Sequence, residues 1–237
     1  MEDTYNIKAI VLDRKSCAES DSRVVVYSRE AGKLELMARG AKKIKSKLAG
    51  HLEPFNLTDI MAVHGKKYDY VGGASSQNCY SGIKNDLAKL AQAGRSVKNI
   101  NDLIKPGLAD EKIFDLIISY FDALEKSKKG CGTISSIFML NFLSYLGQKP
   151  ELTACLVCAG RIKPGKNKFN LARGGLVCPV CADLKAAHQA IISDNAIKLL
   201  KLALRGNFKE FIKIKIDQKT EKEFEKIIEL FFQYNFN

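Results

Sequence analysis

Two Cys-x-x-Cys pairs are the residues of this chain whose spacing is best suited to chemistry. Cys155 and Cys158 form the first pair, Cys178 and Cys181 form the second, and residues 159–177 separate them. A two-residue gap lets one tight turn aim both sulfurs at one metal ion, and the intervening segment is long enough to bring the second pair to the other side of that ion. The spacing therefore predicts a tetrahedral zinc (Zn²⁺) site.

Other uses of paired cysteines fit the pattern less well. A redox dithiol usually comes as a single pair at a junction of strand and helix, whereas here a second pair matches the first. Iron–sulfur clusters generally use other spacings, and free thiols are the remaining alternative. Four cysteines would also fill the shell of a zinc ion and leave no position open for water or substrate. A bound ion is therefore expected to be structural rather than catalytic.

The charge of the chain favours polyanionic partners. It carries 38 Lys and Arg against 26 Asp and Glu, a net charge of +12, which by itself does not distinguish DNA, RNA and anionic membranes. Residues 36–52 contain no acidic residue, and five cations lie close together within them: Arg39, Lys42, Lys43, Lys45 and Lys47. The segment between the cysteine pairs is a second acid-free run, and it contains Arg161, Lys163, Lys166, Lys168 and Arg173. Such runs are commonly solvated loops, but two of them in one chain also fit a shared track for phosphates.

Motifs of catalysis are missing from the sequence. It contains no phosphate-binding Gly-rich loop with Lys, no Gly-x-Ser-x-Gly elbow and no His-Glu-x-x-His helix. Four aspartates among the predicted strands could hold magnesium for a nuclease, although no pair has a diagnostic spacing: Asp13, Asp21, Asp59 and Asp69. Positions on a solvated surface explain them better. We therefore expect no catalytic residues and no enzyme activity.

The start of the chain predicts neither a secretion signal nor a membrane span. It reads Met-Glu-Asp-Thr and continues with alternating residues instead of an apolar run. Outside the quartet, three cysteines are left over: Cys17, Cys79 and Cys131. An odd and dispersed set of this kind is typical of a reducing compartment, so a cytoplasmic location is expected.

The elements that would position these residues change type near residue 80. Five segments rich in β-branched and aromatic residues, separated by turn residues, are predicted strands: 5–12, 23–28, 33–39, 55–64 and 68–74. They fit a β-barrel of the oligonucleotide-binding (OB) type, whose face can bind single strands, and they fit an SH3-like barrel almost as well. Tyr27, Tyr68 and Tyr70 could stack on bases, but each is more readily explained as a core residue.

The remainder of the chain has the periodicity of helices. A first apolar stripe begins at Leu87, and a largely apolar helix over residues 133–146 is expected at the centre of a second core. Ser193 or Asp194 should cap a helix that follows the cysteine segment, and an amphipathic helix with several phenylalanines comes last. The expected fold class is α+β. A five-stranded OB-fold barrel over residues 1–80 is followed by a mainly α-helical domain over residues 81–237, with a four-cysteine zinc loop at 150–185.

Two stretches far apart in the sequence resemble the RecO family of bacterial recombination mediators. The first is the basic run from Met37 to Phe55, which contains Arg-Gly-Ala-Lys-Lys and ends in Glu-Pro-Phe. The second begins with Leu-Gly-Gln-Lys-Pro-Glu-Leu at residues 146–152 and continues through both cysteine pairs, with Phe-Asn-Leu-Ala-Arg-Gly-Gly-Leu-Val before the second pair. The order of barrel, helices, zinc loop and helices agrees with that family over almost the whole chain.

The resemblance implies a DNA-binding protein of recombinational repair at the bacterial nucleoid, without enzymatic turnover. Such proteins bind single- and double-stranded DNA, anneal complementary strands, engage the C-terminal tail of the single-strand-binding protein, and join RecR to help load RecA. We expect DNA to be bound by the cations of the first basic run: Arg39, Lys42, Lys43, Lys45 and Lys47. An RNA-binding zinc-ribbon protein, and a metal-dependent nuclease, are the alternative interpretations.

Overall fold

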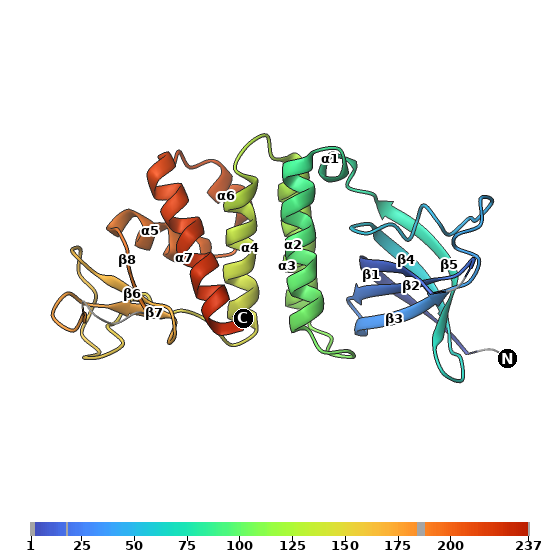
Figure 1. Cartoon of the computed structure of the whole chain (residues 1–237), viewed down its shortest axis with the longest axis horizontal. Coiled ribbons are helices and arrows are strands. Elements are labelled where there is room, and N and C mark those ends of the chain that lie inside the picture. Colours follow the sequence, from blue (N-terminus) through green and yellow to red (C-terminus); the bar gives the residue numbers. More distant parts are fainter. Residues whose placement is uncertain (1–2, 18, 184–187, 237) are drawn as a thin grey trace. The chain divides into compact units, whose positions relative to one another are not determined.

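The computed structural model of the 237-residue chain describes residues 3–17, 19–183 and 188–236. The chain forms two compact units, Met1–Lys126 and Ser127–Asn237. Figure 1 shows the strands of the first unit in blue and teal and the last helices of the second unit in orange and red. Within the described residues, no helix has both the length and the apolar character that crossing a membrane requires.

Five strands close into a barrel in the first unit, with four antiparallel pairings and one parallel pairing. Their bounds are β1 Thr4–Ser16, β2 Ser22–Ser28, β3 Gly32–Ala38, β4 Leu57–Val63 and β5 Asp69–Asn78. The order around the barrel is β1-β2-β3-β5-β4, with β1 also paired to β4. The β3–β5 pairing is parallel and aligns Met37 with Tyr70. This closed, OB-like barrel confirms the predicted fold class.

Alternate side chains along the strands point into the barrel, and those that fill it are small or branched. Ile7, Ala9 and Val11 of β1 point into the same core cluster as Val24 and Val26 of β2. The segment that joins β3 to β4 adds Ala41 and Leu52, both completely buried, to this cluster. The basic run is therefore attached to the barrel through its own apolar residues.

Three helices complete the first unit: α1 Ser81–Lys84, α2 Leu87–Leu103 and α3 Glu111–Lys126. The side chain of Asp110 accepts hydrogen bonds from the N–H groups of Lys112 and Ile113, as expected of a helix cap. Buried Tyr27 of β2 donates its hydroxyl to the carbonyl of Asp110, which ties α3 to the barrel. By packing, these helices belong with the barrel. The predicted domain boundary, between residues 1–80 and 81–237, is placed where strands give way to helices and not by packing. It stays a prediction.

The second unit is built from four helices and a small sheet. Its helices are α4 Cys131–Tyr145, α5 Asp194–Ala203, α6 Phe208–Ile212 and α7 Gln218–Phe236. Most of α4 is buried, which agrees with its predicted central place in the core. The Ser193 hydroxyl accepts a hydrogen bond from the N–H of Ala196 and so caps α5. Phe224, Ile227 and Phe231 give α7 its buried face.

The cysteine segment contains a three-stranded antiparallel sheet that sequence patterns did not predict. Its strands are β6 Lys168–Asn170, β7 Gly175–Val177 and β8 Gln189–Ile191, in the order β7-β6-β8. Phe169 of β6 packs edge-on against Phe231 of α7, with ring centroids 5.6 Å apart. Strands of three residues carry too little periodicity to be recognised, so this sheet depends on its tertiary contacts.

Candidate metal centre and nucleic-acid surface

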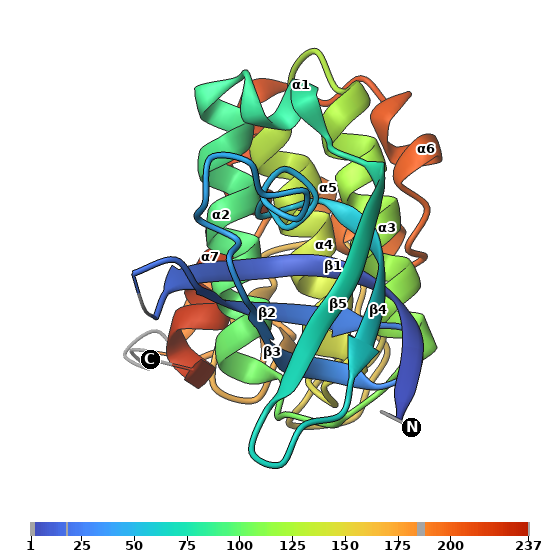
Figure 2. The same cartoon turned by 90° about the vertical axis from the view of Figure 1, so that its right-hand side faces the viewer.

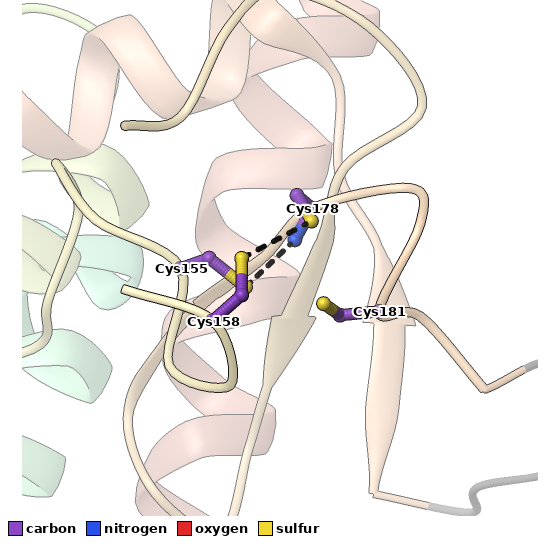
Figure 3. Close-up of side chains that lie close together, drawn as sticks. All are labelled: Cys155, Cys158, Cys178 and Cys181. Carbon is purple, nitrogen blue, oxygen red and sulfur yellow. Dashed lines mark hydrogen bonds between the residues drawn. The ribbon is translucent and has the colours of Figure 1, made fainter. Parts of the chain in front are cut away.

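The four cysteines of the two pairs meet at one point of the second unit. The Sγ atoms of Cys155, Cys158, Cys178 and Cys181 all lie within 4.8 Å of one another. Figure 3 shows Cys178 directly after β7, facing the turn that holds the first pair. All four are free thiols, and the Sγ atoms of Cys158 and Cys178 are 3.9 Å apart, too far for a disulfide. The quartet could therefore hold one metal ion.

The turn that carries the first pair is tightly organised by its backbone. The N–H of Cys155 donates to the carbonyl of Gly160, and the N–H of Ala159 donates back to the carbonyl of Cys155. Ala159 is left-handed, with φ 55°. Ahead of the turn, the carboxylate of Glu151 accepts the hydroxyl of Thr153 and two backbone N–H groups, which lower the pKa of Glu151 to about 2. These contacts order the backbone that carries both cysteines.

Backbone N–H groups also point at the buried sulfur of the quartet. Burial disfavours the thiolate of Cys155, but the N–H groups of Cys178 and Val157 point at its sulfur, and with its other hydrogen bonds they lower its pKa to about 6. The pKa of Cys181 is raised to about 12, first by its hydrogen bond with Cys178 and then by that with Cys158. Of these two thiols, Cys155 is the one whose negative charge the surroundings favour.

Four thiolates are a donor set that suits zinc. Thiolate ligands at about 2.3 Å in a tetrahedron lie about 3.8 Å from one another. The 3.9 Å between the sulfurs of Cys158 and Cys178 is close to that edge. Four sulfurs leave no open position, which is the arrangement of a structural site and not of a catalytic one.

The predicted DNA-binding residues lie on the segment between β3 and β4 in the first unit. All five side chains are exposed: Arg39, Lys42, Lys43, Lys45 and Lys47. The guanidinium of Arg39 lies over the ring of Tyr70, 4.0 Å from its centroid, and the Nζ of Lys42 donates to the hydroxyl of Ser16. We call residues 39–47 the basic loop.

Arg14 of β1 braces this segment, and no sequence motif points to it. Its guanidinium donates to the carbonyls of Ala41 and Ala49, each at 2.8 Å, and to the hydroxyl of Ser22 at 3.3 Å. It also forms an ion pair with Glu53 at 2.9 Å, and its side chain is only 14% exposed. Arg14 thus ties both ends of the basic loop to the barrel.

A second set of hydrogen bonds holds the far end of the same segment. The side-chain amide of Asn56 donates to the carbonyls of Gly50 and His51, and Thr58 donates to the carbonyl of His51. The ring of His51 is hydrogen-bonded to Ser76 of β5 through Nδ1. His51 therefore has a structural role at the base of the loop, as expected of a packing histidine.

The second acid-free run lies on the unit that holds the cysteines. Four of its five cations are exposed: Arg161, Lys163, Lys166 and Arg173. Lys168 differs from the expectation of a solvated loop because it lies in β6, where its Nζ donates to the carbonyl of Asp183. Only 9% of this residue is exposed.

The three candidate tyrosines have different environments. Tyr27 is fully buried, as expected of a core residue, and Tyr70 is half-buried beneath Arg39. Tyr68 is 44% exposed, next to β5. Exposure therefore singles out Tyr68, which sequence periodicity alone could not do.

The four aspartates considered for magnesium serve separate local contacts. Asp13 pairs with Lys15, Asp21 accepts the N–H of Gly40, and Asp59 accepts the amide of Gln77. Asp69 is hydrogen-bonded to Tyr5. Among residues that the structure describes, the cysteine quartet is the one group of three or more potential ligands that converges. This favours the interpretation of these aspartates as structural and surface residues.

One spacing that sequence reasoning overlooked is His51-Leu52-Glu53, which has the His-x-Glu pattern used by zinc deaminases. The ring of His51 is bonded to Ser76, and Glu53 pairs with Arg14. Neither residue belongs to the ligand cluster formed by the cysteines. The pattern is explained by the bracing of the basic loop.

Comparison with known protein families gives two matches that together span nearly the whole chain. Residues 1–80 match the family described as recombination protein O N terminal, and residues 84–236 match the family described as recombination protein O C terminal. The first covers the barrel and the basic loop. The second covers the helices and the cysteine quartet.

Similar proteins come from several bacteria and carry the name DNA repair protein RecO. The protein of Rubrobacter xylanophilus is 31% identical over 177 residues, which cover 75% of this chain and 71% of that protein. The protein of Alkaliphilus metalliredigens is 24% identical over 97% of this chain and 95% of its own length. The protein of Desulforamulus reducens is 26% identical over 97% of this chain and 89% of its own length.

Proposed function

This chain belongs to the RecO family of DNA repair proteins, and we propose that it is a DNA-binding recombination mediator. In this proposal it binds single- and double-stranded DNA and anneals complementary strands. Together with RecR, it helps to load RecA onto DNA coated by the single-strand-binding protein. It acts in the bacterial cytoplasm at the nucleoid, and DNA is bound mainly by an OB domain over residues 1–80.

The observation that carries the proposal is the braced basic loop. Five exposed cations stand on a segment whose backbone is held by Arg14 and Asn56 and whose apolar residues enter the barrel core. Because the loop is already ordered, little conformational entropy is lost when phosphates bind to it. Each phosphate that is neutralised releases condensed counterions, which drives binding without any reading of base sequence.

Annealing follows from the same electrostatics. Two complementary strands repel each other through their phosphates, and a positive surface that binds both lowers this repulsion. No bond is made or broken, so the proposed role is physical and not enzymatic. Direct readout of base edges is not required for it.

The salt dependence of binding tests the role of the basic loop. If five phosphate contacts form on single-stranded DNA, the slope of log K against log salt should be about −3.5. Replacement of Arg39, Lys42, Lys43, Lys45 and Lys47 by Gln should bring the slope close to zero. A matched control variant removes the same charge from exposed lysines of the second unit: Lys198, Lys201, Lys215, Lys219 and Lys222.

The two variants separate local from overall charge because each lowers the net charge from +12 to +7, that is 12 − 5. The control should keep most of the slope. An unchanged slope in the loop variant would remove the basic loop from the proposal. Fluorescence anisotropy of a labelled oligonucleotide over a range of salt concentrations provides the measurement.

The alternative functions are distinguished by two direct comparisons. An RNA-binding zinc-ribbon protein would prefer single-stranded RNA over DNA of the same sequence, so the ratio of the two affinities decides between them. A metal-dependent nuclease would cleave labelled DNA in the presence of magnesium or manganese. The separate local contacts of the four aspartates speak against the nuclease.

We further propose that the quartet holds one structural Zn²⁺ ion. Bound zinc supplies a closed cross-link between the turn of Cys155 and Cys158 and the end of β7. The residues of the chain position the sulfurs, and the backbone N–H groups at Cys155 stabilise negative charge there.

The tail of the single-strand-binding protein is proposed to bind a groove of the second unit. The groove lies where α4 begins, beside α6 and α7, and is lined by Lys129, Thr133, Ile134, Phe211, Ile214, Ile216 and Glu221, together with Gly130. Ile214 is 41% exposed, and Lys213 and Lys215 on either side of it are also exposed. The family resemblance implies a tail that is acidic and ends in an aromatic residue. Apolar side chains with a basic rim suit such a tail.

Calorimetry with the full-length chain and a tail peptide tests the groove. Ile214→Ser should weaken peptide binding, whereas Ile191→Ser, which removes an 81% exposed isoleucine from β8, should not. Equal effects of the two changes would place the tail elsewhere.

A further inference from the structure

The turn between β4 and β5 presents an aromatic ring among cations. This turn, residues 64–68, projects beyond the strands of the barrel in Figure 2. Tyr68 is 44% exposed, and the neighbouring Lys66 and Lys67 are exposed as well. The Nζ of Lys67 lies 5.4 Å from the centroid of the Tyr68 ring. An exposed ring beside cations is the combination that binds an unpaired base together with its phosphate.

A network of hydrogen bonds centred on Asp69 holds the turn in place. The carboxylate of Asp69 accepts the Tyr5 hydroxyl at 2.6 Å and is 3.2 Å from Nδ1 of His64. It also accepts the N–H of Gly65 at 3.4 Å. The rings of Tyr5 and His64 pack with their centroids 4.6 Å apart. Because Tyr5 of β1, Asp69 of β5 and the two residues that follow β4 all take part in this network, Tyr68 is presented by an ordered turn.

Close packing within the turn supports the same conclusion. A Cβ atom at Gly65 would lie 2.2 Å from the carbonyl oxygen of Tyr68 and 2.6 Å from the ring of Tyr70. Residue 65 therefore has room for glycine alone. The carbonyl of Tyr68 therefore lies close against Gly65.

The turn is connected to the basic loop through Tyr70. Tyr68 ends the turn two residues before Tyr70, which lies in β5. Tyr70 is aligned with Met37 of β3, and the guanidinium of Arg39 lies 4.0 Å from its ring centroid. The turn that carries Tyr68 therefore leads directly into the residue that contacts the first cation of the basic loop.

We propose that Tyr68 stacks on an unpaired base and makes the β4–β5 turn a subsite for single-stranded DNA. The proposal rests on the proposed function and assigns it a second kind of contact. The basic loop binds phosphates, which single strands and duplexes share. Tyr68 binds the face of a base, which a duplex hides between neighbouring base pairs. Preference for single strands then comes from the turn and not from the charge.

Affinity measurements on three DNA molecules test the subsite. Tyr68→Ala should weaken binding of oligothymidylate about tenfold, whereas Tyr68→Phe should retain the affinity of the original chain. Neither change should alter binding to a duplex or to an abasic oligonucleotide, which has the same phosphates and no bases. The slope of log K against log salt should also stay the same, since stacking on a base releases no counterions.

A fluorescence experiment locates the contact directly, because the chain contains no tryptophan. Tyr68→Trp introduces a single indole, and its emission should be quenched by oligothymidylate but not by the abasic oligonucleotide. Tyr145→Trp serves as the matched control, since Tyr145 is 47% exposed and lies on α4 of the second unit. Its emission should not change with either DNA.

The results separate the inference from the function on which it rests. If the unchanged protein binds neither single-stranded nor duplex DNA, both the proposed function and the subsite are wrong. If it binds DNA with the expected salt slope but Tyr68→Ala binds oligothymidylate equally well, only the subsite is wrong. In the Tyr68→Trp variant, quenching of the indole by the abasic oligonucleotide to the same extent as by oligothymidylate would also overturn the stacking contact.

Discussion

Arg14 shows how a residue without a motif can decide the geometry of a site. It lies in β1, where a strand cation ordinarily faces solvent, and nothing in the sequence near it marks a function. In the structure it donates to Ala41, Ala49 and Glu53, which are distant from it along the chain. The cations of the basic loop could be predicted from their spacing. Their support could not, because it depends on contacts between distant residues.

Removal of the Arg14 guanidinium should loosen the basic loop without unfolding the barrel. Arg14→Met keeps the aliphatic stem but leaves two backbone carbonyls and Glu53 without their partner, so the free energy of unfolding should fall by about 1–3 kcal/mol. Limited proteolysis should show new cleavage within residues 40–52, and urea titration measures the stability. Lys15→Met is the control, because Lys15 is exposed and pairs only with its neighbour Asp13. Identical behaviour of the two variants would contradict the bracing role.

Glu225 is a carboxylate whose pKa is raised by its surroundings. Burial is the main cause, and the neighbouring charges of Glu221 and Glu229 on α7 add to it, against the hydrogen bond from Thr133. A carboxyl whose folded-state pKa is raised contributes stability while it is protonated. This contribution is lost as the pH rises through the folded pKa.

Glu225→Gln should therefore stabilise the protein at pH 7. The amide can still accept the Thr133 hydroxyl, and loss of the two repulsions should raise the free energy of unfolding by about 0.5–1 kcal/mol. The gain should shrink as the pH falls toward the ordinary pKa of Glu, because the original side chain is then protonated as well. Thermal melts at pH 7 and pH 4.5 provide the measurement, with exposed Glu210→Gln as the control. A gain of equal size at both pH values would exclude the electrostatic cause.

At the level of elements, long segments with clear periodicity were predicted well and short ones were not. The five strands and the helices α2, α4, α5 and α7 follow from alternation, helical stripes and turn residues. Sequence patterns left OB-like and SH3-like barrels open, because the parallel pairing of β3 with β5 joins segments that share no local signal. The helix α6 and the sheet β6–β8 were missed since elements of three to five residues depend on tertiary packing.

The sheet β6–β8 and the turn of the first cysteine pair should depend on the metal ion. One zinc per chain is expected by atomic emission, and three of the seven cysteines should react with a thiol reagent before chelation and all seven after it. Zinc at about 1,000 times its dissociation constant would stabilise the second unit by about 4 kcal/mol, so chelation should lower its melting temperature. Cys158→Ser should reproduce this loss, while Cys17→Ser, outside the quartet, should not. Retention of zinc by Cys158→Ser would contradict the four-cysteine site.

For the molecule as a whole, the sequence indicated a polyanion-binding protein with a metal cross-link. The four cysteines were predicted by spacing alone and converge as expected. The groove at α6 and α7 was not predictable in detail, because Ile134, Phe211 and Ile214 come from segments that share only tertiary contacts. A groove of this kind is formed only when the chain has folded.

Strand annealing tests the proposed function as a whole. Complementary oligonucleotides coated with single-strand-binding protein should anneal about tenfold more slowly when Lys42, Lys43, Lys45 and Lys47 are replaced by Gln, and high salt should remove the difference. The control replaces four exposed lysines of the second unit that lie outside the proposed tail groove: Lys198, Lys201, Lys219 and Lys222. Equal rates in the two variants would show that annealing depends on total charge and not on the basic loop.

The closed strand order of the barrel restricts how any other macromolecule can recognise this half of the protein. Each strand already has a neighbour on both sides, from the β1–β2 and β1–β4 pairings round to β3–β5. The β3–β5 pairing is short and aligns only Leu36 with Asp69 and Met37 with Tyr70, but no strand of the closed order is an edge strand. Recognition of this unit should therefore proceed mainly through side chains. Binding that depends on surface side chains can be weakened by single substitutions in a protein that still folds.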